Sequence, residues 1–146
     1  MNYIELSGTN AVCRSLLIKT LEPVCKKYEL TRLELDVLLF LQDTGNKGDT
    51  AADLVEMRKL SKSHVSLAVS KLYEKGLIDK RYEDGNHKSI HLFLTYRAAP
   101  IVADGLEAEQ TYLRLLFKGF TKEEQKMMQT FMERVKRNAL LALEKI

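Results

Sequence analysis

The spacing of hydrophobic residues predicts a mainly helical chain. Apolar side chains recur at helical spacing from about Asn10 onward, which indicates a long first helix that Pro23 would kink. The segment after Thr31 is apolar on nearly every side, as expected of a central helix buried by several neighbours. The last helical pattern runs from Thr121 nearly to the C-terminus, and residues 139–143 within it are apolar all round. A terminal helix of this kind usually packs against something else.

Capping residues place the starts of these helices. Three capping boxes, in which a hydroxyl and a carboxylate satisfy free backbone N–H groups, are Thr31 with Glu34, Thr50 with Asp53, and Thr121 with Glu124. We also expect Ser61 to cap a helix over 61–75 and Thr95 to cap a long helix to about Lys118. Gly76 and Gly119 are typical of the ends of those two helices.

The segment from Thr50 to Thr95 has the most specific pattern. A short helix to about Arg58 and a tight turn precede the helix over 61–75. Alternating strands are expected at 77–82 and 89–94, and the dipeptide Asp84-Gly85 between them is a hairpin signal. This order predicts a winged helix-turn-helix. The expected fold class is mainly α (α+β), in the order α-α-α-α-β-β-α-α.

We expect one domain over residues 1–146. Within it, residues 31–94 would form the winged helix-turn-helix that binds DNA. The apolar helices at 1–30 and 95–146 exceed what the core of a winged domain needs, so we expect them to form a homodimer. Two copies would then contact half-sites about 34 Å apart on a DNA duplex.

The helix over 61–75 has the properties of a recognition helix. Val65, Ala68, Val69 and Leu72 form its core stripe. The opposite face, which we expect to contact DNA, carries Ser61, Lys62, Ser63, His64, Ser66, Leu67, Ser70 and Lys71. Serine and lysine side chains contact phosphates and base edges, and a leucine can contact the methyl group of thymine. No acidic residue interrupts the sequence from 59 to 73. An ordinary solvated helix face is the alternative interpretation.

The hairpin supplies a second basic element, the wing. Arg81, Asn86, His87 and Lys88 are its candidate DNA-binding residues, placed along phosphates or in the minor groove. Residues 50–94 contain eight Lys and Arg against six Asp and Glu. The positive charge available for DNA is therefore modest.

Composition narrows the remaining possibilities. The 146 residues carry 23 Lys and Arg and 20 Asp and Glu, for a formal charge of +3, which permits an anionic partner without demanding one. We expect a soluble, cytoplasmic protein without a membrane segment, cofactor or metal. We also expect no enzyme, because candidate nucleophiles, acids and bases do not assemble. His87 and His91 would stand about 13 Å apart along a strand, too far to share a metal.

Two cysteines on the first helix, Cys13 and Cys25, would lie about 18 Å apart along its axis and cannot form a disulfide. Buried hydrophobic residues are their expected role. Cys13 remains a candidate redox-sensing thiol.

Three segments resemble the MarR family of bacterial transcriptional regulators: LSKSHVS at 60–66, LYEKGLI at 72–78, and Leu94-Thr95. The match is free of gaps over residues 50–95, and the order and length of the flanking helices extend it over the chain. The resemblance implies a homodimer on a pseudo-palindromic DNA operator, with the helix over 61–75 in the major groove and the wing over 77–94 near the minor groove. It further implies repression that is relieved by a small aromatic or anionic ligand, bound between the dimer helices and the winged domain, or by an oxidant.

The chain departs from the family pattern at several positions. The wing has Asn86-His87-Lys88 where the family usually has Asp-Arg-Arg, and an ammonium replaces a guanidinium there. Lys59 occupies a position that is often glycine, and Leu67 one that is often arginine. We therefore expect a different base preference.

Two other functions stay open at this point. One is a winged-helix module that binds proteins and no longer reads DNA. The other is a thiol-based redox sensor, although Cys13 lies several residues further along the helix than the reactive cysteine of the peroxide-sensing branch.

Overall fold

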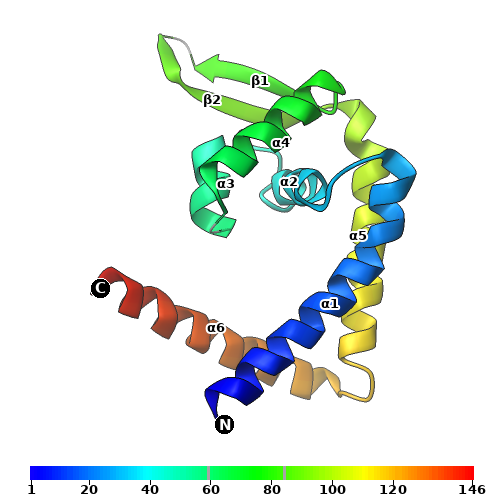
Figure 1. Ribbon diagram of the computed structural model, residues 1–146, viewed down its shortest axis with the longest axis vertical. Helices are drawn as coiled ribbons and strands as arrows, with labels where there is room; N and C mark the ends of the chain where they lie inside the picture. The colour runs from blue at the N-terminus through cyan, green and yellow to red at the C-terminus, as the bar shows by residue number, and fades with distance from the viewer. Residues whose placement is uncertain (59, 84) are drawn as a thin grey trace. The chain divides into compact units, whose positions relative to one another are not determined.

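The computed structural model describes the backbone of residues 1–58, 60–83 and 85–146, and within these ranges all side chains except those of Met57, Asn86 and His87. Its elements are α1 (Tyr3–Tyr28), α2 (Arg32–Asp43), α3 (Ala51–Arg58), α4 (Lys62–Glu74), β1 (Ile78–Glu83), β2 (Asn86–Leu94), the 3-10 helix η1 (Tyr96–Ala98), α5 (Ala99–Leu116) and α6 (Lys122–Glu144) (Figure 1). The expected mainly α fold with a two-stranded antiparallel wing is confirmed.

The chain forms two compact units, Met1–Tyr112 and Leu113–Ile146, and each is described by itself. The division expected from the sequence, with residues 31–94 between two dimerisation parts, stays a prediction. None of the helices in the described part of the chain has the length and hydrophobicity that crossing a membrane requires.

The core of the first unit is built around α2. Its side chains from Leu35 to Leu41, apart from the half-buried Asp36, are almost entirely removed from solvent. Figure 1 shows α2 nearly end-on, with α3 and α4 on one side and α5 on the other. The other elements add their inward faces, which include Leu21, Val24, Leu54, Leu72, Ile78, Leu92, Ile101 and Val102. The prediction that this central helix is buried by several neighbours is therefore confirmed.

The three predicted capping boxes are present, each with hydrogen bonds in both directions. A fourth corrects the start of the first helix, which is Tyr3 and not about Asn10. The Asn2 side chain accepts from Glu5 N, and the Glu5 carboxylate accepts from Asn2 N, at 2.9 Å each. Residues 1–12 are all exposed, so this part of α1 lacks the apolar periodicity that reveals a buried helix. The helix continues through Pro23.

Two other predicted boundaries were wrong. Thr95 precedes η1 instead of an α-helix, and its side chain makes no capping hydrogen bond. Its hydroxyl instead donates to the carbonyl of Gly76 at 2.6 Å, a contact with a residue 19 positions earlier that local sequence does not reveal. The second strand begins at Asn86 instead of Ser89, since pairing with Glu83 extends it past the polar tip. Of the predicted turn, Asp84 lies outside the described residues, and Gly85 has a φ of +76°.

The loop between α2 and α3 holds the base of the wing. Leu92 N donates to Asp49 O at 2.9 Å, and Leu94 N donates to the Asn46 side chain at 2.8 Å. Gly48 lies directly beneath the ring of Phe93. The buried carboxylate of Asp49 accepts a hydrogen bond from the Thr44 hydroxyl, which fixes the loop internally. An isolated antiparallel bridge between Thr50 and His91 adds to these contacts, so the loop is paired with β2 at its base while the sheet itself has two strands.

The second unit contains the end of α5 and the whole of α6. The rings of Phe117 and Phe120 meet edge to face, 5.4 Å between centroids, around the turn at Gly119. None of the residues of α6, all of which are described, is buried. Its large exposed apolar side chains are Met127, Met128, Phe131, Met132, Val135, Leu140, Leu141 and Leu143.

Candidate nucleic-acid interface

Helix α4 is held by one face and free on the other. Val65 and Leu72 are completely buried, and Ala68 and Val69 nearly so, against the core built by α2 and α3. The predicted core stripe of this helix is therefore confirmed. Four inward side chains at i, i+3, i+4 and i+7 fix the rotation of the helix about its axis. The rotation decides which side chains remain available to a partner.

The eight side chains that the sequence singled out are all exposed: Ser61, Lys62, Ser63, His64, Ser66, Leu67, Ser70 and Lys71. Leu67 has 60% of its surface exposed, which is a large fraction for a leucine. The structure thus leaves the whole set accessible to a partner, seven of them on α4 and Ser61 at its N-cap. Contact between these residues and DNA stays a prediction.

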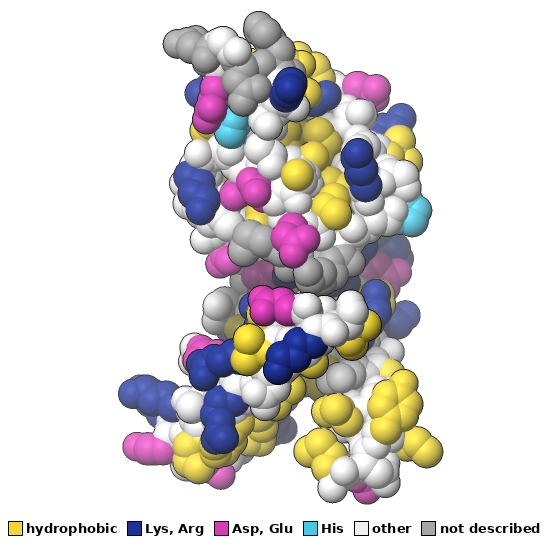
Figure 2. Space-filling model, turned by 90° about the vertical axis from the view of Figure 1, so that its left-hand side faces the viewer, with side chains coloured by type: hydrophobic (Ala, Val, Ile, Leu, Met, Phe, Trp, Pro, Cys, Tyr) yellow, Lys and Arg dark blue, Asp and Glu magenta, His cyan; other side chains and the backbone are white. Residues whose placement is uncertain are grey.

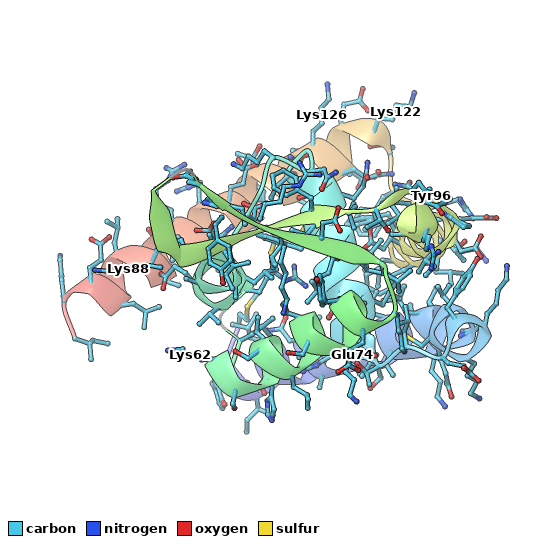
Figure 3. All side chains as sticks on the ribbon, turned by 90° about the horizontal axis from the view of Figure 1, so that it is seen from above. Lys62, Glu74, Lys88, Tyr96, Lys122 and Lys126 are labelled. Carbon is cyan, nitrogen blue, oxygen red and sulfur yellow. The ribbon has the colours of Figure 1, made fainter. Side chains whose placement is uncertain are left out.

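The two ends of this face differ. At the start of α4, Ser61 makes no side-chain cap, contrary to expectation, because its hydroxyl pairs with that of Ser63 at 3.0 Å. At the other end Lys71 lies 3.8 Å from Glu74, and both side chains are more than half exposed. Figure 3 shows Lys62 and Glu74 at opposite ends of the helix, with Lys88 of the wing toward the same end as Lys62.

Tyr73 was missed by sequence reasoning. Half of its surface is exposed, and the ammonium of Lys80 lies 4.7 Å from the centroid of its ring. The cation therefore joins β1 to α4 through a cation–π contact. Tyr73 follows Ser70 by three residues, so helical periodicity alone places it on the exposed face.

The wing carries cations that are oriented by neighbours. The guanidinium of Arg81 lies 4.5 Å from the centroid of the Phe93 ring and 3.8 Å from the carboxylate of Asp79. Its side chain is still 63% exposed. Lys88 is also exposed. The predicted contacts of the Asn86 and His87 side chains, and the role of Lys59 in the turn before α4, lie outside the described residues.

His91 joins the wing to the loop beneath it. Its Nδ1 atom lies 2.7 Å from the carbonyl oxygen of Gly48, and its Nε2 atom 3.3 Å from the carboxylate of Glu83. Both ring nitrogens therefore face acceptors of the protein itself. Across the described residues, no three histidine, cysteine or acidic side chains gather as metal ligands.

Charge on this part of the molecule is mixed. In the upper half of Figure 2, which shows the winged part, single Lys and Arg side chains stand among acidic ones. This arrangement agrees with the small local excess of positive charge. On this face the positive charge is therefore carried by separate side chains instead of one broad basic patch.

Two cavities lie where α2 approaches α5. The larger, of about 460 Å³, is mostly apolar and is lined by Gln42, Asn46, Leu94, Thr95, Tyr96, Ala98, Ala99, Val102, Ala103 and Leu106. The smaller, of about 240 Å³, contains three carboxylates and one guanidinium, those of Asp36, Asp43, Glu109 and Arg58. Burial first, and then the carboxylates of Asp36 and Asp43, raise the pKa of Glu109. No cluster of cations marks either cavity among its lining residues.

The cysteines are unpaired, as expected, and both are half-buried on α1. Burial raises the pKa of the Cys25 thiol, which reduces its reactivity at neutral pH. The redox role considered for Cys13 stays untested.

Comparison with known proteins agrees with this geometry. A profile of the MarR family matches residues 28–88. No curated protein matches the chain in sequence. A protein from Listeria monocytogenes, described as a MarR family transcriptional regulator complexed with 26mer DNA, shares 25% identity and a TM-score of 0.84, with 94% of this chain and 89% of that one covered.

Two further structures are similar. A SlyA-like transcription regulator from Listeria monocytogenes shares 26% identity and a TM-score of 0.80, covering 95% of this chain and 90% of that one. BpsR from Bordetella bronchiseptica, whose DNA binding is regulated by 6-hydroxynicotinic acid, shares 14% identity and a TM-score of 0.73, covering 90% and 98%. At that identity the likeness shows the fold alone. The profile match over the helix-turn-helix, the shared fold over nearly the whole length and the motifs around α4 together support a winged-helix transcriptional regulator of the MarR type.

Proposed function

We propose that the chain reads double-stranded DNA with α4 in the major groove. The observation that carries the proposal is the division of α4 into a fully buried core stripe and an exposed face of serines, lysines and His64. A helix that enters the groove must be fixed on one side and must present short polar and cationic groups on the other. The DNA-bound relative from Listeria monocytogenes supports the same use of the fold.

The wing would add contacts beside the groove. Arg81 and Lys88 are exposed cations on the hairpin, and Asn86 and His87 stand at the position where the resemblance implies minor-groove contacts. Phe93 and Asp79 orient the guanidinium of Arg81, so this side chain would need little rearrangement to contact a phosphate. Preorganisation of this kind lowers the entropy lost on binding.

We further propose a homodimer on a pseudo-palindromic operator, acting as a repressor. The exposed apolar side chains of α6 support dimerisation, since exposed apolar patches commonly mark protein–protein interaction sites. The mostly apolar cavity of about 460 Å³ is the site we propose for a small aromatic or anionic effector. Regulation of BpsR by 6-hydroxynicotinic acid is a precedent for an aromatic effector within this fold.

The test is selection of bound sequences from a pool of random DNA duplexes by the full-length protein. An inverted repeat, with half-sites about one helical turn apart, would support DNA reading and dimer symmetry together. Recovery of no shared sequence would refute specific reading.

A salt titration separates DNA binding from the alternative of a protein-interaction module. Binding that depends on phosphate contacts weakens steeply with salt, with a slope of log K against log[salt] of about −0.9 per phosphate neutralised. Lys62→Met should make this slope shallower by about one contact. Lys19→Met is the matched control, because Lys19 is an exposed lysine on α1, outside the proposed interface. A slope near zero for the unmodified protein would favour the interaction module.

A further inference from the structure

The last turn of α4 is attached to the two flanking helices that lead away from the winged part. The helix ends at Glu74, Lys75 is its C-cap, and Gly76 follows with a φ of +72°. On one side this turn meets the junction between α1 and α2. On the other it meets the residues that start η1 and α5. Contacts with the α1–α2 junction and with the start of η1 therefore hold the C-terminal end of α4 in place.

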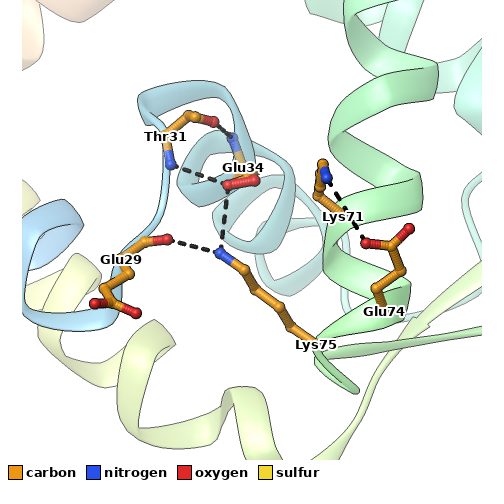
Figure 4. A network of polar contacts seen from close by, with 6 residues as sticks. All are labelled: Glu29, Thr31, Glu34, Lys71, Glu74 and Lys75. Carbon is orange, nitrogen blue, oxygen red and sulfur yellow. Dashed lines mark hydrogen bonds and ion pairs between the residues drawn. The ribbon is translucent and has the colours of Figure 1, made fainter.

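Lys75 makes the contact with the α1–α2 junction (Figure 4). Its ammonium donates to the carbonyl of Glu29 at 2.6 Å and lies 3.8 Å from the carboxylate of Glu34. Glu29 is the C-cap of α1 and has left-handed backbone angles, so the ammonium sits at the carbonyl end of a long helix, where the helix dipole favours a cation.

Glu34 makes this contact hard to replace. Only 4% of its surface is exposed, and its carboxylate also accepts from Thr31 N at 3.0 Å in the capping box of α2. A buried carboxylate is costly unless a cation and hydrogen bonds compensate it. Lys75 supplies the cation, although it belongs to α4, more than 40 residues further along the chain. The C-cap residue of α4 thus supplies the positive charge that offsets the buried carboxylate at the start of α2.

Thr95 makes the contact on the other side. Its hydroxyl donates to the carbonyl of Gly76 at 2.6 Å, and its backbone N–H donates to the carbonyl of Leu77 at 3.1 Å. Arg97 covers the same turn, since a Cβ atom on Gly76 would lie 3.3 Å from its Nη1 atom. The end of α4 is therefore held between the α1–α2 junction and the segment that starts η1.

We propose that Lys75 is a positioning residue, which sets the angle of the recognition helix by fixing its end to the α1–α2 junction. The proposal rests on the proposed function. Lys71 is a contrast within the same helix. It stands one turn earlier, its side chain is 54% exposed, and its ammonium lies 3.8 Å from the carboxylate of Glu74, which belongs to α4 itself. The ammonium of Lys75 is instead engaged by two groups of another part of the fold.

Lys75→Met and Lys71→Met distinguish positioning from phosphate contact. On the sequence selected by the unmodified protein, Lys75→Met should weaken binding by about tenfold, within the usual range of coupling between sites. Binding to a random duplex and the salt slope should stay unchanged. Lys71→Met should weaken binding to both duplexes and reduce the salt slope by about 0.9. Lys75→Arg should restore specific binding, since a guanidinium can donate to both acceptors.

Two results would overturn the proposal. One is a salt slope reduced by Lys75→Met as much as by Lys71→Met, which would make Lys75 a phosphate contact. The other is specific binding by Lys75→Met equal to that of the unmodified protein. Titration of active protein before each measurement removes any effect of a smaller folded fraction. Lys75→Gln replaces Lys75→Met if the latter does not fold.

A second measurement needs no DNA and separates failure of this inference from failure of the proposed function. Hydrogen exchange of the full-length protein reports the amides of Leu30 and Leu77, which donate to Cys25 O and Leu72 O on the two sides of the contact. Lys75→Met should accelerate both together and leave Leu54 in α3 unchanged, whereas Lys71→Met should leave Leu30 unchanged. Leu30 protected equally in Lys75→Met and the unmodified protein would refute the attachment, even if no operator had been found.

Discussion

Replacing Gly48 by alanine tests whether the α2–α3 loop supports the wing. Gly48 has a φ of +96°, and a Cβ atom there would lie 2.7 Å from Cζ of Phe93 and 3.3 Å from both Cε atoms of that ring. The substitution therefore combines an unfavourable backbone conformation with a steric clash. It should also displace the carbonyl that His91 contacts.

The two effects have separable magnitudes. A left-handed conformation costs an L-residue about 1–2 kcal/mol. A methyl group forced into a packed site costs about 1–3 kcal/mol more. Gly48→Ala should therefore lower the free energy of unfolding by about 2–5 kcal/mol in total. Gly45→Ala is the matched control, because Gly45 has a φ of +85° but no atom within 4 Å of its Cβ position. It should cost about 1–2 kcal/mol.

Urea denaturation of the two variants measures the difference between their free energies of unfolding directly. Replacing glycine lowers the entropy of the unfolded chain in both variants, so this effect cancels in the comparison. In a Phe93→Leu background, which lacks the Cζ atom, Gly48→Ala should become less destabilising. Equal free energies of unfolding for Gly48→Ala and Gly45→Ala, or strict additivity with Phe93→Leu, would refute the clash with the ring.

Three other predictions concern ionisable groups. Because burial and nearby carboxylates raise the pKa of Glu109, the folded state binds a proton more tightly than the unfolded chain, and ionisation at neutral pH costs stability. Glu109→Gln should therefore raise the urea midpoint at pH 7, and this gain in stability should disappear below about pH 4. The control Glu107→Gln, at an exposed position, should not raise the midpoint. Asp104 has the opposite sign: hydrogen bonds from Lys27 and Tyr28 lower its pKa, so its contribution to stability is present at pH 7 and is lost as pH falls through the lowered value. Asp104→Asn should lower the midpoint at pH 7 and have little effect in strong acid; a constant loss at every pH would contradict this reasoning. Burial raises the pKa of Cys25, so iodoacetamide should alkylate this thiol more slowly in the folded protein than in urea. For the other cysteine, Cys13→Ser should leave any release of DNA by peroxide unchanged.

The sequence predicted those features that depend on neighbouring residues. Capping boxes at Thr31, Thr50 and Thr121 need only two side chains three positions apart, and all three form. The face of α4 was also predictable, because periodicity fixes which side chains turn inward. The first turns of α1 were missed since they bury nothing, and periodicity detects burial instead of helix.

Long-range contacts were beyond sequence reasoning. Thr95 has the residue type of a helix cap, but a carbonyl 19 positions earlier takes its hydroxyl. Lys75 reads as one more charge near a helix end, and nothing local indicates that Glu34 requires it. Asn46 and Gly48 read as loop residues, although the amide of one and the carbonyl of the other support the wing. In each case the partner is set by the tertiary fold.

The attachment of the wing to the α2–α3 loop has a consequence for how this protein can change. Leu92 N, Asp49 O and Gly48 O are main-chain groups, so that part of the support persists whatever side chains occupy the far end of the hairpin. We therefore expect that replacing the segment from Asn86 to Lys88 by that of another winged protein would change the proposed groove contacts and leave these contacts at the base of the wing in place. New operator preferences would then arise from a few substitutions at the tip of the hairpin. The main-chain contacts at its base, and the stability that they provide, would be kept.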